Sequence, residues 1–133
     1  MKTFDEQGSV SWGTMREQDL VPVFLDVLEA AEHPGASRLR HMAQDILKGN
    51  WDEDAPGWDT EEMSWFVSED LWDAMQDVAP PYCYFGAHPG DGADYGFWID
   101  EDLAWALYEA GIEDPDLSDP EMLERIAEID ATL

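Results

Sequence analysis

Three side chains near the middle of the chain, His88, Asp91 and Asp94, belong to types that bind metal ions or move protons. A histidine with two carboxylates supplies ligands that zinc accepts, and the same groups can act as acid and base. Their spacing matches no motif with a known mechanism, and aspartate and glycine favour turns for backbone reasons alone. We therefore expect a structural turn, with a metal-dependent or hydrolytic enzyme at these residues as the less favoured alternative.

The only cysteine, Cys83, lies in a run of apolar and aromatic residues from Tyr82 to Phe85. A cysteine in such a run usually packs as a small apolar side chain, so we do not expect it to be a nucleophile. One cysteine permits no internal disulfide, and the sequence shows no apolar signal segment. We expect a cytoplasmic protein.

The acid-rich loop that begins at Asp52 matches an EF-hand calcium loop only in part. Asp52, Asp54 and Gly57 fall on the first, third and sixth positions of that loop. Met63 stands at the twelfth position, where the bidentate glutamate ligand belongs. Because this ligand is missing, the sequence predicts no dedicated metal site here, and it indicates no cofactor.

The charge of the chain is its strongest signal, because 32 acidic residues against 6 basic ones give a net charge of −26. The first 50 residues hold eight acids and five bases, whereas the remainder holds 24 acids and a single base, Arg125. A field of this sign repels nucleic acid and anionic membranes and attracts basic partners. The sequence therefore predicts no direct binding to nucleic acid and no membrane association, and it favours a basic protein as partner.

Carboxylates recur every four residues at Glu69, Asp73 and Asp77. On a helix such residues lie about 6 Å apart along the axis, roughly the spacing of consecutive phosphates along a DNA strand. A row of this kind could occupy the basic groove of a DNA-handling protein. The expected partner-binding residues are Asp52, Glu53, Asp54, Asp59, Glu61, Glu62, Glu69, Asp70, Asp73 and Asp77, with Asp91 and Asp94 at a loop tip as second choices.

Two simpler explanations of the acidity stay open. Carboxylates at helical spacing are usually a solvated helix face, and a general excess of acids is also typical of salt-adapted proteins. Salt adaptation would spread the acids over the whole surface, so the contrast between the two parts of the chain favours a specialised face. Trp51 and Trp58 stand beside acids and are either exposed interface anchors or core residues.

Apolar residues at helical spacing predict a first helix at about 17–32 and a second at about 36–48. A third helix begins at Asp59 or Thr60 and runs to the stop at Pro80, with an apolar stripe on one side and carboxylates on the other. The third helix must therefore carry most of the candidate acids.

Two aromatic runs, 82–85 and 95–99, predict the strands of a β-hairpin whose loop spans 86–94. An isolated hairpin is only marginally stable, so it must pack on helices or recruit a third strand, for which 9–12 is available. Because the apolar side chains of the hairpin must also be shielded from water, the helices that flank it in the chain are expected to pack on it.

Beyond the hairpin, Asp100 caps a further helix and Ser118 caps the last one. The sequence as a whole predicts a single compact acidic domain over 1–133. Its fold class is α+β, with four to five helices packed on a β-hairpin or a small three-stranded antiparallel sheet.

Three segments, GTMREQDLVPVFLDVLEA, EDAPGWDTEE and FGAHPGDGADYGFW, together resemble a family of small acidic proteins encoded on phages and conjugative elements. The match spans roughly 13–98, and the last segment is its most specific part. In size and charge the chain is also similar to anti-defence proteins that imitate DNA, among them anti-CRISPR and antirestriction proteins. The second resemblance has no matched motifs, so no functional residues are transferred from it.

The acidic row and these resemblances imply a non-enzymatic inhibitor of a host nucleic-acid-binding defence enzyme, of the anti-CRISPR or antirestriction type. Such an inhibitor would act in the host cytoplasm as a DNA mimic on a basic DNA-binding protein, for example a CRISPR effector or a restriction enzyme. The alternative is an acidic antitoxin or immunity protein that neutralises a basic nuclease. An unpaired hairpin edge or exposed tryptophans could also support a homodimer.

Overall fold

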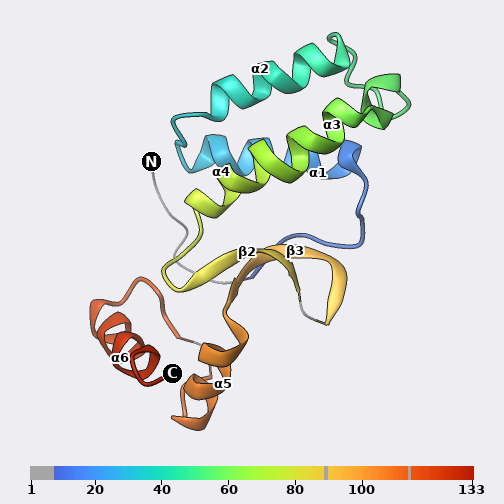
Figure 1. The fold of residues 1–133 in the computed structure, drawn as a ribbon. Helices are drawn as coiled ribbons and strands as arrows, with labels where there is room; N and C mark the ends of the chain where they lie inside the picture. Colours follow the sequence, from blue (N-terminus) through green and yellow to red (C-terminus); the bar gives the residue numbers. More distant parts are fainter. Residues whose placement is uncertain (1–7, 89, 114) are drawn as a thin grey trace.

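The computed structural model describes residues 8–88, 90–113 and 115–133 and shows an α+β fold (Figure 1). The described part holds a three-stranded antiparallel sheet and five helices, if the continuous helix formed by α3, η2 and α4 is counted once. The predicted fold class is therefore confirmed. In chain order the elements are β1 (Gly8–Ser11), α1 (Glu17–Ala30), α2 (Ala36–Leu47), η1 (Pro56–Asp59), α3 (Glu61–Trp65), η2 (Phe66–Leu71), α4 (Trp72–Asp77), β2 (Cys83–His88), β3 (Asp91–Ile99), α5 (Glu101–Glu109) and α6 (Pro120–Asp130).

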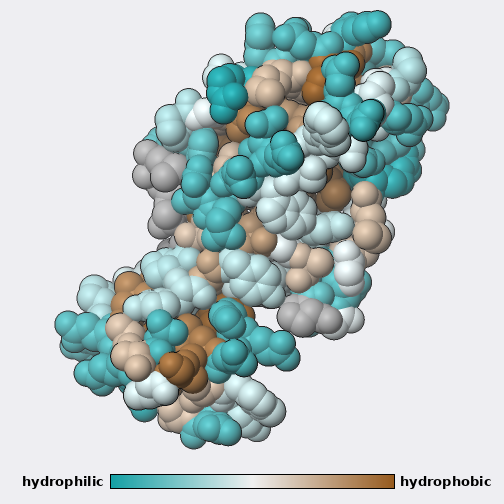
Figure 2. Space-filling view, viewed as in Figure 1, coloured by the Kyte–Doolittle hydropathy of each residue, from teal (hydrophilic) through white to brown (hydrophobic). Residues whose placement is uncertain are grey.

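Hydrophilic side chains cover much of the face seen in Figure 2, over the α1–α4 region as well as over α5 and α6. Apolar side chains reach this face only in small areas. Among the described residues, no helix combines the length and the apolar character that crossing a membrane requires.

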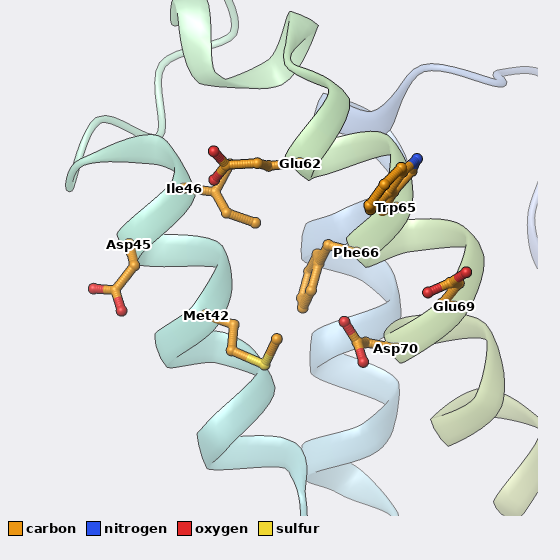
Figure 3. A pocket seen from close by; sticks show the side chains of 8 residues that line it. All are labelled: Met42, Asp45, Ile46, Glu62, Trp65, Phe66, Glu69 and Asp70. Atoms are coloured by element: carbon orange, nitrogen blue, oxygen red, sulfur yellow. The ribbon is translucent and has the colours of Figure 1, made fainter.

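The helix from Glu61 to Asp77, made of α3, η2 and α4, is called the acidic helix below. It begins with a side-chain cap, because the Thr60 hydroxyl accepts a hydrogen bond from the backbone N–H of Met63 at 3.2 Å. Its middle part, η2, is a π-helical segment, in which backbone hydrogen bonds span one residue more than in an α-helix. Of the two predicted starts, Asp59 and Thr60, it is Thr60 that caps the helix. Figure 3 shows the acidic helix lying beside α2.

The central strand of the sheet is β3, and both neighbours, β1 and β2, pair with it in antiparallel fashion. Gly96 pairs with Ser9 on β1 and with Gly86 on β2. A Cβ at Gly96 would lie only 2.2 Å from the carbonyl oxygen of Gly8, so the close approach of β1 requires glycine at this position. The predicted hairpin is confirmed, and so is the third strand expected at 9–12, although β1 begins and ends one residue earlier.

The turn between β2 and β3 is shorter than the loop predicted at 86–94. Most of that loop belongs to the strands, because β2 extends to His88 and β3 begins at Asp91. Two hydrogen bonds hold the turn together: His88 Nδ1 accepts the Gly90 N–H at 2.9 Å, and Asp91 Oδ1 accepts a backbone N–H at 3.1 Å. The prediction that Asp94 stands at the loop tip is wrong, since Asp94 lies half-buried within β3.

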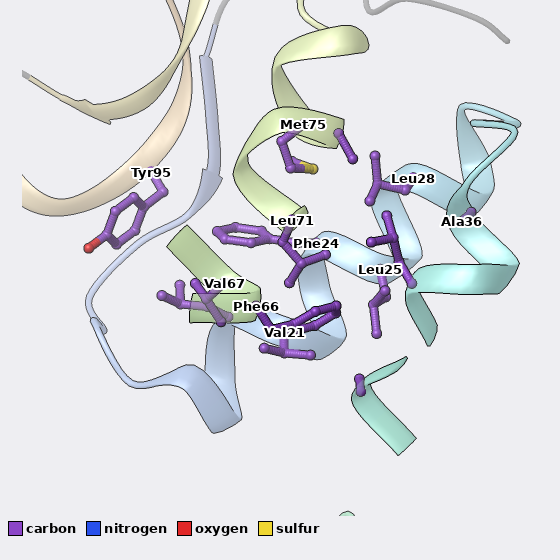
Figure 4. Packing of buried hydrophobic residues seen from close by; sticks show 14 of the residues in the cluster. Val21, Phe24, Leu25, Leu28, Ala36, Phe66, Val67, Leu71, Met75 and Tyr95 are labelled. Carbon is purple, nitrogen blue, oxygen red and sulfur yellow. The ribbon is translucent and has the colours of Figure 1, made fainter. Parts of the chain in front are cut away.

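The larger of two hydrophobic clusters lies between α1, α2, the acidic helix and the sheet (Figure 4). Phe24 of α1 is fully buried and connects the helices to the sheet. Its ring meets the edge of Phe85 at 5.1 Å between centroids and that of Tyr95 at 6.3 Å. Burial of each such side chain stabilises the fold by about 1.5–3 kcal/mol, so this cluster holds the acidic helix in place.

A smaller cluster forms around α5 and α6, which Figure 1 shows across the sheet from α1 and α2. Cys83 on β2 lies opposite Ile99 on β3 and contacts both clusters, so the end of the hairpin joins them. The buried members of the smaller cluster are Ile99, Leu103, Leu107, Ile112, Leu117 and Ile126.

The predicted N-cap is confirmed for α5 and wrong for α6. Asp100 caps α5, as predicted, by accepting a backbone N–H of the first turn at 3.3 Å. The cap of α6 is Asp119, whose carboxylate accepts the Glu121 N–H at 3.1 Å, so the prediction of Ser118 is wrong. The Ser118 hydroxyl donates instead to Asp116, and this hydrogen bond lowers the pKa of the Asp116 carboxyl.

Candidate protein-binding surface

The acidic helix separates its apolar and charged residues onto opposite sides. Met63, Leu71 and Met75 are fully buried on the side that faces the core. Hydrophobic burial therefore fixes the rotation of the helix and turns the carboxylates outward. The exposed acids along it are Glu61, Glu62, Glu69, Asp70, Asp73 and Asp77.

The remaining acids of this surface precede the helix. Asp52, Glu53 and Asp54 lie in an exposed loop, and Asp59 is the last residue of η1. The indole nitrogen of the buried Trp58 donates to the carbonyl oxygen of Asp52 at 2.8 Å. This hydrogen bond holds the loop carboxylates close to the beginning of the acidic helix.

Two of the three arginines of the N-terminal part, Arg16 and Arg40, pair with acids outside the acidic helix. Arg40 on α2 forms salt bridges with Glu29 and Asp26 of α1, the latter at 3.0 Å. The hydrogen bond with Glu29 is the main reason why the pKa of Arg40 is raised. Arg16 pairs with Glu53 at 3.0 Å, which raises the pKa of Arg16. These contacts leave the acidic helix without a lysine or arginine partner among the described residues.

Two of the ten acids between residues 52 and 77 have a basic partner in the described part of the chain, namely Glu53 with Arg16 and Asp77 with His33. Exposed carboxylates that lack internal counter-ions attract external cations. The other eight form no salt bridge with a described basic residue, although Asp54 is near enough to Arg16 to help raise the pKa of that arginine. We call these eight the unpaired acids: Asp52, Asp54, Asp59, Glu61, Glu62, Glu69, Asp70 and Asp73.

The contact between His33 and Asp77 changes the row expected at Glu69, Asp73 and Asp77. The Gly35 N–H donates to His33 Nδ1 at 2.9 Å, so in this arrangement the proton of the neutral ring is on Nε2. Nε2 then donates to the Asp77 carboxylate at 2.9 Å. The row therefore has two free carboxylates and one that is already held inside the protein.

A groove of about 360 Å³ separates the acidic helix from α2 (Figure 3). Met42 and Ile46 of α2 and Phe66 of the acidic helix line its middle, and Glu62 and Asp70 point into it from the acidic helix. The groove thus combines an apolar floor with carboxylates at its margin. Its other lining residues are Asp45, Trp65 and Glu69.

The three residues that suggested metal or acid–base chemistry lie on strands β2 and β3, and not on the acidic helix or the loop before it. His88 and Asp91 face each other across the hairpin, and both accept hydrogen bonds that shape the turn. Asp94 Oδ1 is buried and finds no hydrogen-bond partner in the part of the chain that the structure describes. Within 8–88, 90–113 and 115–133, no three His, Cys, Asp or Glu side chains form a group able to hold a metal ion.

The exposed tryptophans are not those that the sequence suggested. Trp58 is buried and packs edge-on against the half-buried Trp51, at 6.1 Å between ring centroids, so the idea that Trp58 is an exposed anchor is wrong. Trp12, just after β1, is exposed by 71%, and Trp65 on the acidic helix and Trp105 on α5 are exposed by 63% and 66%. The signal that sequence reasoning missed for Trp65 and Trp105 was helical phase, since both lie off the apolar stripe of their helix.

Cys83 packs in the predicted way, half-buried against both hydrophobic clusters. Burial raises the pKa of its thiol to about 11. Because the thiolate is the reactive form, this environment leaves little nucleophile at neutral pH.

The chemistry that this surface supports best is the binding of cationic side chains. The unpaired acids supply charge, and the groove adds apolar contact and an exposed indole beside the carboxylates. The resemblance to small acidic proteins of phages and conjugative elements stays a prediction. No protein-family model, no curated protein and no solved structure matches this chain.

Proposed function

We propose that this protein inhibits a DNA-binding enzyme of host defence by occupying its DNA-binding groove. The observation that carries the proposal is the set of unpaired acids on and before the acidic helix. Grooves that hold DNA are lined by arginine and lysine, which pair with carboxylates by the same charge-assisted hydrogen bonds that they make to phosphates. Inhibitor and DNA would then exclude each other.

The acidic helix supports this proposal because its buried side packs into the larger hydrophobic cluster, which fixes its position. A preformed row of charges loses little conformational entropy on binding, unlike an acidic tail. Glu69 and Asp73 form the free part of the row, and the loop acids Asp52 and Asp54 extend it towards the beginning of the helix, while Glu53 between them is paired with Arg16. Asp77 contributes less, since His33 already holds it.

The class of partner that we propose is a CRISPR effector or a restriction enzyme in the cytoplasm of a bacterial host. Such enzymes read or hold duplex DNA with arginine and lysine side chains before they cleave it. An inhibitor on that surface would prevent the first contact with DNA, without any chemistry of its own.

The test uses two double charge reversals with the same spacing and the same net charge. Glu69→Lys/Asp73→Lys changes the acidic helix, and Glu124→Lys/Glu128→Lys changes the exposed acids of α6. Immobilised protein captures its partner from host lysate, and the captured protein is then challenged with duplex DNA. We expect capture to be lost with the first variant, kept with the second, and reversed by DNA and by salt.

Two results would contradict the proposal. If DNA and this protein occupy the captured enzyme together, the mode of inhibition is not mimicry. If both reversals abolish capture equally, net charge and not the acidic helix determines binding.

A further inference from the structure

We propose that the groove between α2 and the acidic helix receives an arginine side chain of the partner. The inference rests on the proposed function only for the basic character of that partner. It adds the type of residue that is recognised and the place where it binds.

The floor of the groove suits the aliphatic part of a long basic side chain. Met42 and Ile46 are half-buried, and Phe66 is exposed by only 2%. Arginine and lysine commonly lay their methylene groups along apolar surface while the charged end reaches polar partners. An acidic helix face without such a floor could offer charge but little contact area.

Two carboxylates lie beside this apolar floor. Glu62 and Asp70 point into the groove from the acidic helix, and neither has a salt bridge with a described basic residue (Figure 3). Arg38, the nearby arginine of α2, donates to the Met42 sulfur at 3.4 Å and has no salt bridge to these acids. An incoming cation therefore meets carboxylates that no described side chain has neutralised.

Trp65 favours arginine over lysine. Its indole lines the same groove and is exposed by 63%, so a guanidinium group could stack on it without displacing core residues. A guanidinium group is planar and weakly hydrated, and it can stack on an aromatic ring while its N–H groups donate to a carboxylate. The ammonium group of lysine is strongly hydrated and therefore gains less from contact with the indole ring.

Charge argues against a second copy of this chain in the groove. Two molecules that each carry a net charge of −26 repel each other, and the groove is itself bordered by carboxylates. A basic polypeptide is the complementary occupant.

The experiment compares hexa-arginine with hexa-lysine, two peptides of equal charge, by calorimetric titration of the full chain at constant salt. We expect hexa-arginine to bind about two- to fivefold more tightly, the range that one cation–π contact at an exposed site supplies. Trp65→Ala should abolish this preference. The matched control is Trp105→Ala, which removes an equally exposed tryptophan from α5, leaves the charge unchanged and should keep the preference.

A second pair of variants tests the carboxylates at constant net charge. Glu62→Gln/Asp70→Asn should weaken binding of hexa-arginine more than Glu124→Gln/Glu128→Gln on α6, whose acids are exposed as well. Circular dichroism melting curves establish that each variant is folded.

Equal affinity for the two peptides, no binding of either, or a preference that survives Trp65→Ala would overturn the inference. These results are independent of the proposed function, which stands or fails by competition with DNA. A protein that prefers arginine in the groove but coexists with DNA on its partner would contradict mimicry alone.

Discussion

His33 Nε2 donates to the Asp77 carboxylate at 2.9 Å, across 44 positions of sequence. This hydrogen bond fastens the last turn of the acidic helix to the turn between α1 and α2. Since His33 Nδ1 is occupied by the Gly35 N–H, the ring is held at both nitrogens. The acidic helix is thus anchored by a polar contact at one end and by the Thr60 cap at the other.

Removal of this contact should destabilise the protein. His33→Ala is expected to lower the free energy of unfolding by about 1 kcal/mol or more, because two hydrogen bonds of a nearly buried ring are lost. Urea denaturation measures the change. The control is His41→Ala on the exposed side of α2, which should leave stability nearly unchanged. Equal effects of the two variants would argue against a structural role for His33.

Salt should stabilise the fold. The net charge of −26 is concentrated in the chain after residue 50, so folding brings many carboxylates together. Screening shortens the reach of their repulsion from about 10 Å at 0.1 M salt to about 3 Å at 1 M. We expect the melting temperature to rise by several degrees, equally in sodium and potassium chloride. A melting temperature that falls with salt would mean that the few salt bridges outweigh the repulsion.

Alkylation of Cys83 should be slow at neutral pH. Burial raises the pKa of the thiol from 9.0 to about 11, so the reactive thiolate of the folded protein forms only towards pH 11. The rate with iodoacetamide should rise through that pH in the folded protein and already near pH 9 in urea. The same shift predicts that stability is lost between pH 9 and 11, where the unfolded chain ionises first. Fast alkylation of the native protein at pH 8 would contradict this.

Neutralisation of Asp94 should stabilise the sheet. Its Oδ1 is buried and has no hydrogen-bond partner among the described residues, and a polar atom buried without a partner costs free energy. Asp94→Asn is expected to raise the free energy of unfolding by about 1 kcal/mol, as measured in urea. Asp91→Asn is the control, because it removes the same charge from an exposed position and retains the oxygen that accepts the Ala93 N–H. An equal gain from the control would assign the effect to general charge repulsion.

Truncation in the smaller cluster should loosen α5 and α6 first. Ile126 is fully buried there, and Ile126→Ala is expected to cost about 2–5 kcal/mol. Because this cluster is separate from the one around Phe24, amide exchange should accelerate mainly in α5 and α6. A uniform acceleration that includes α1 would show that the two clusters unfold together.

Much of the secondary structure could be predicted from the sequence, because it depends on local patterns. Apolar periodicity and the stops that follow it placed the first two helices within two residues of Glu17–Ala30 and Ala36–Leu47. Turn residues were less reliable guides. Gly and Asp at 86–94 suggested a long loop, but backbone pairing drew most of them into β2 and β3.

The acidic character of the surface could also be read from the sequence, since the positions of the acids and the phase of the helix need no tertiary information. The sequence could not tell which of these acids pair with basic residues inside the protein. Glu53 meets Arg16 and Asp77 meets His33 only because distant segments pack together. The groove has the same origin, since Met42 and Phe66 come from different helices whose approach is decided by the shared hydrophobic cluster. Long-range packing thus selected which carboxylates stay free to bind.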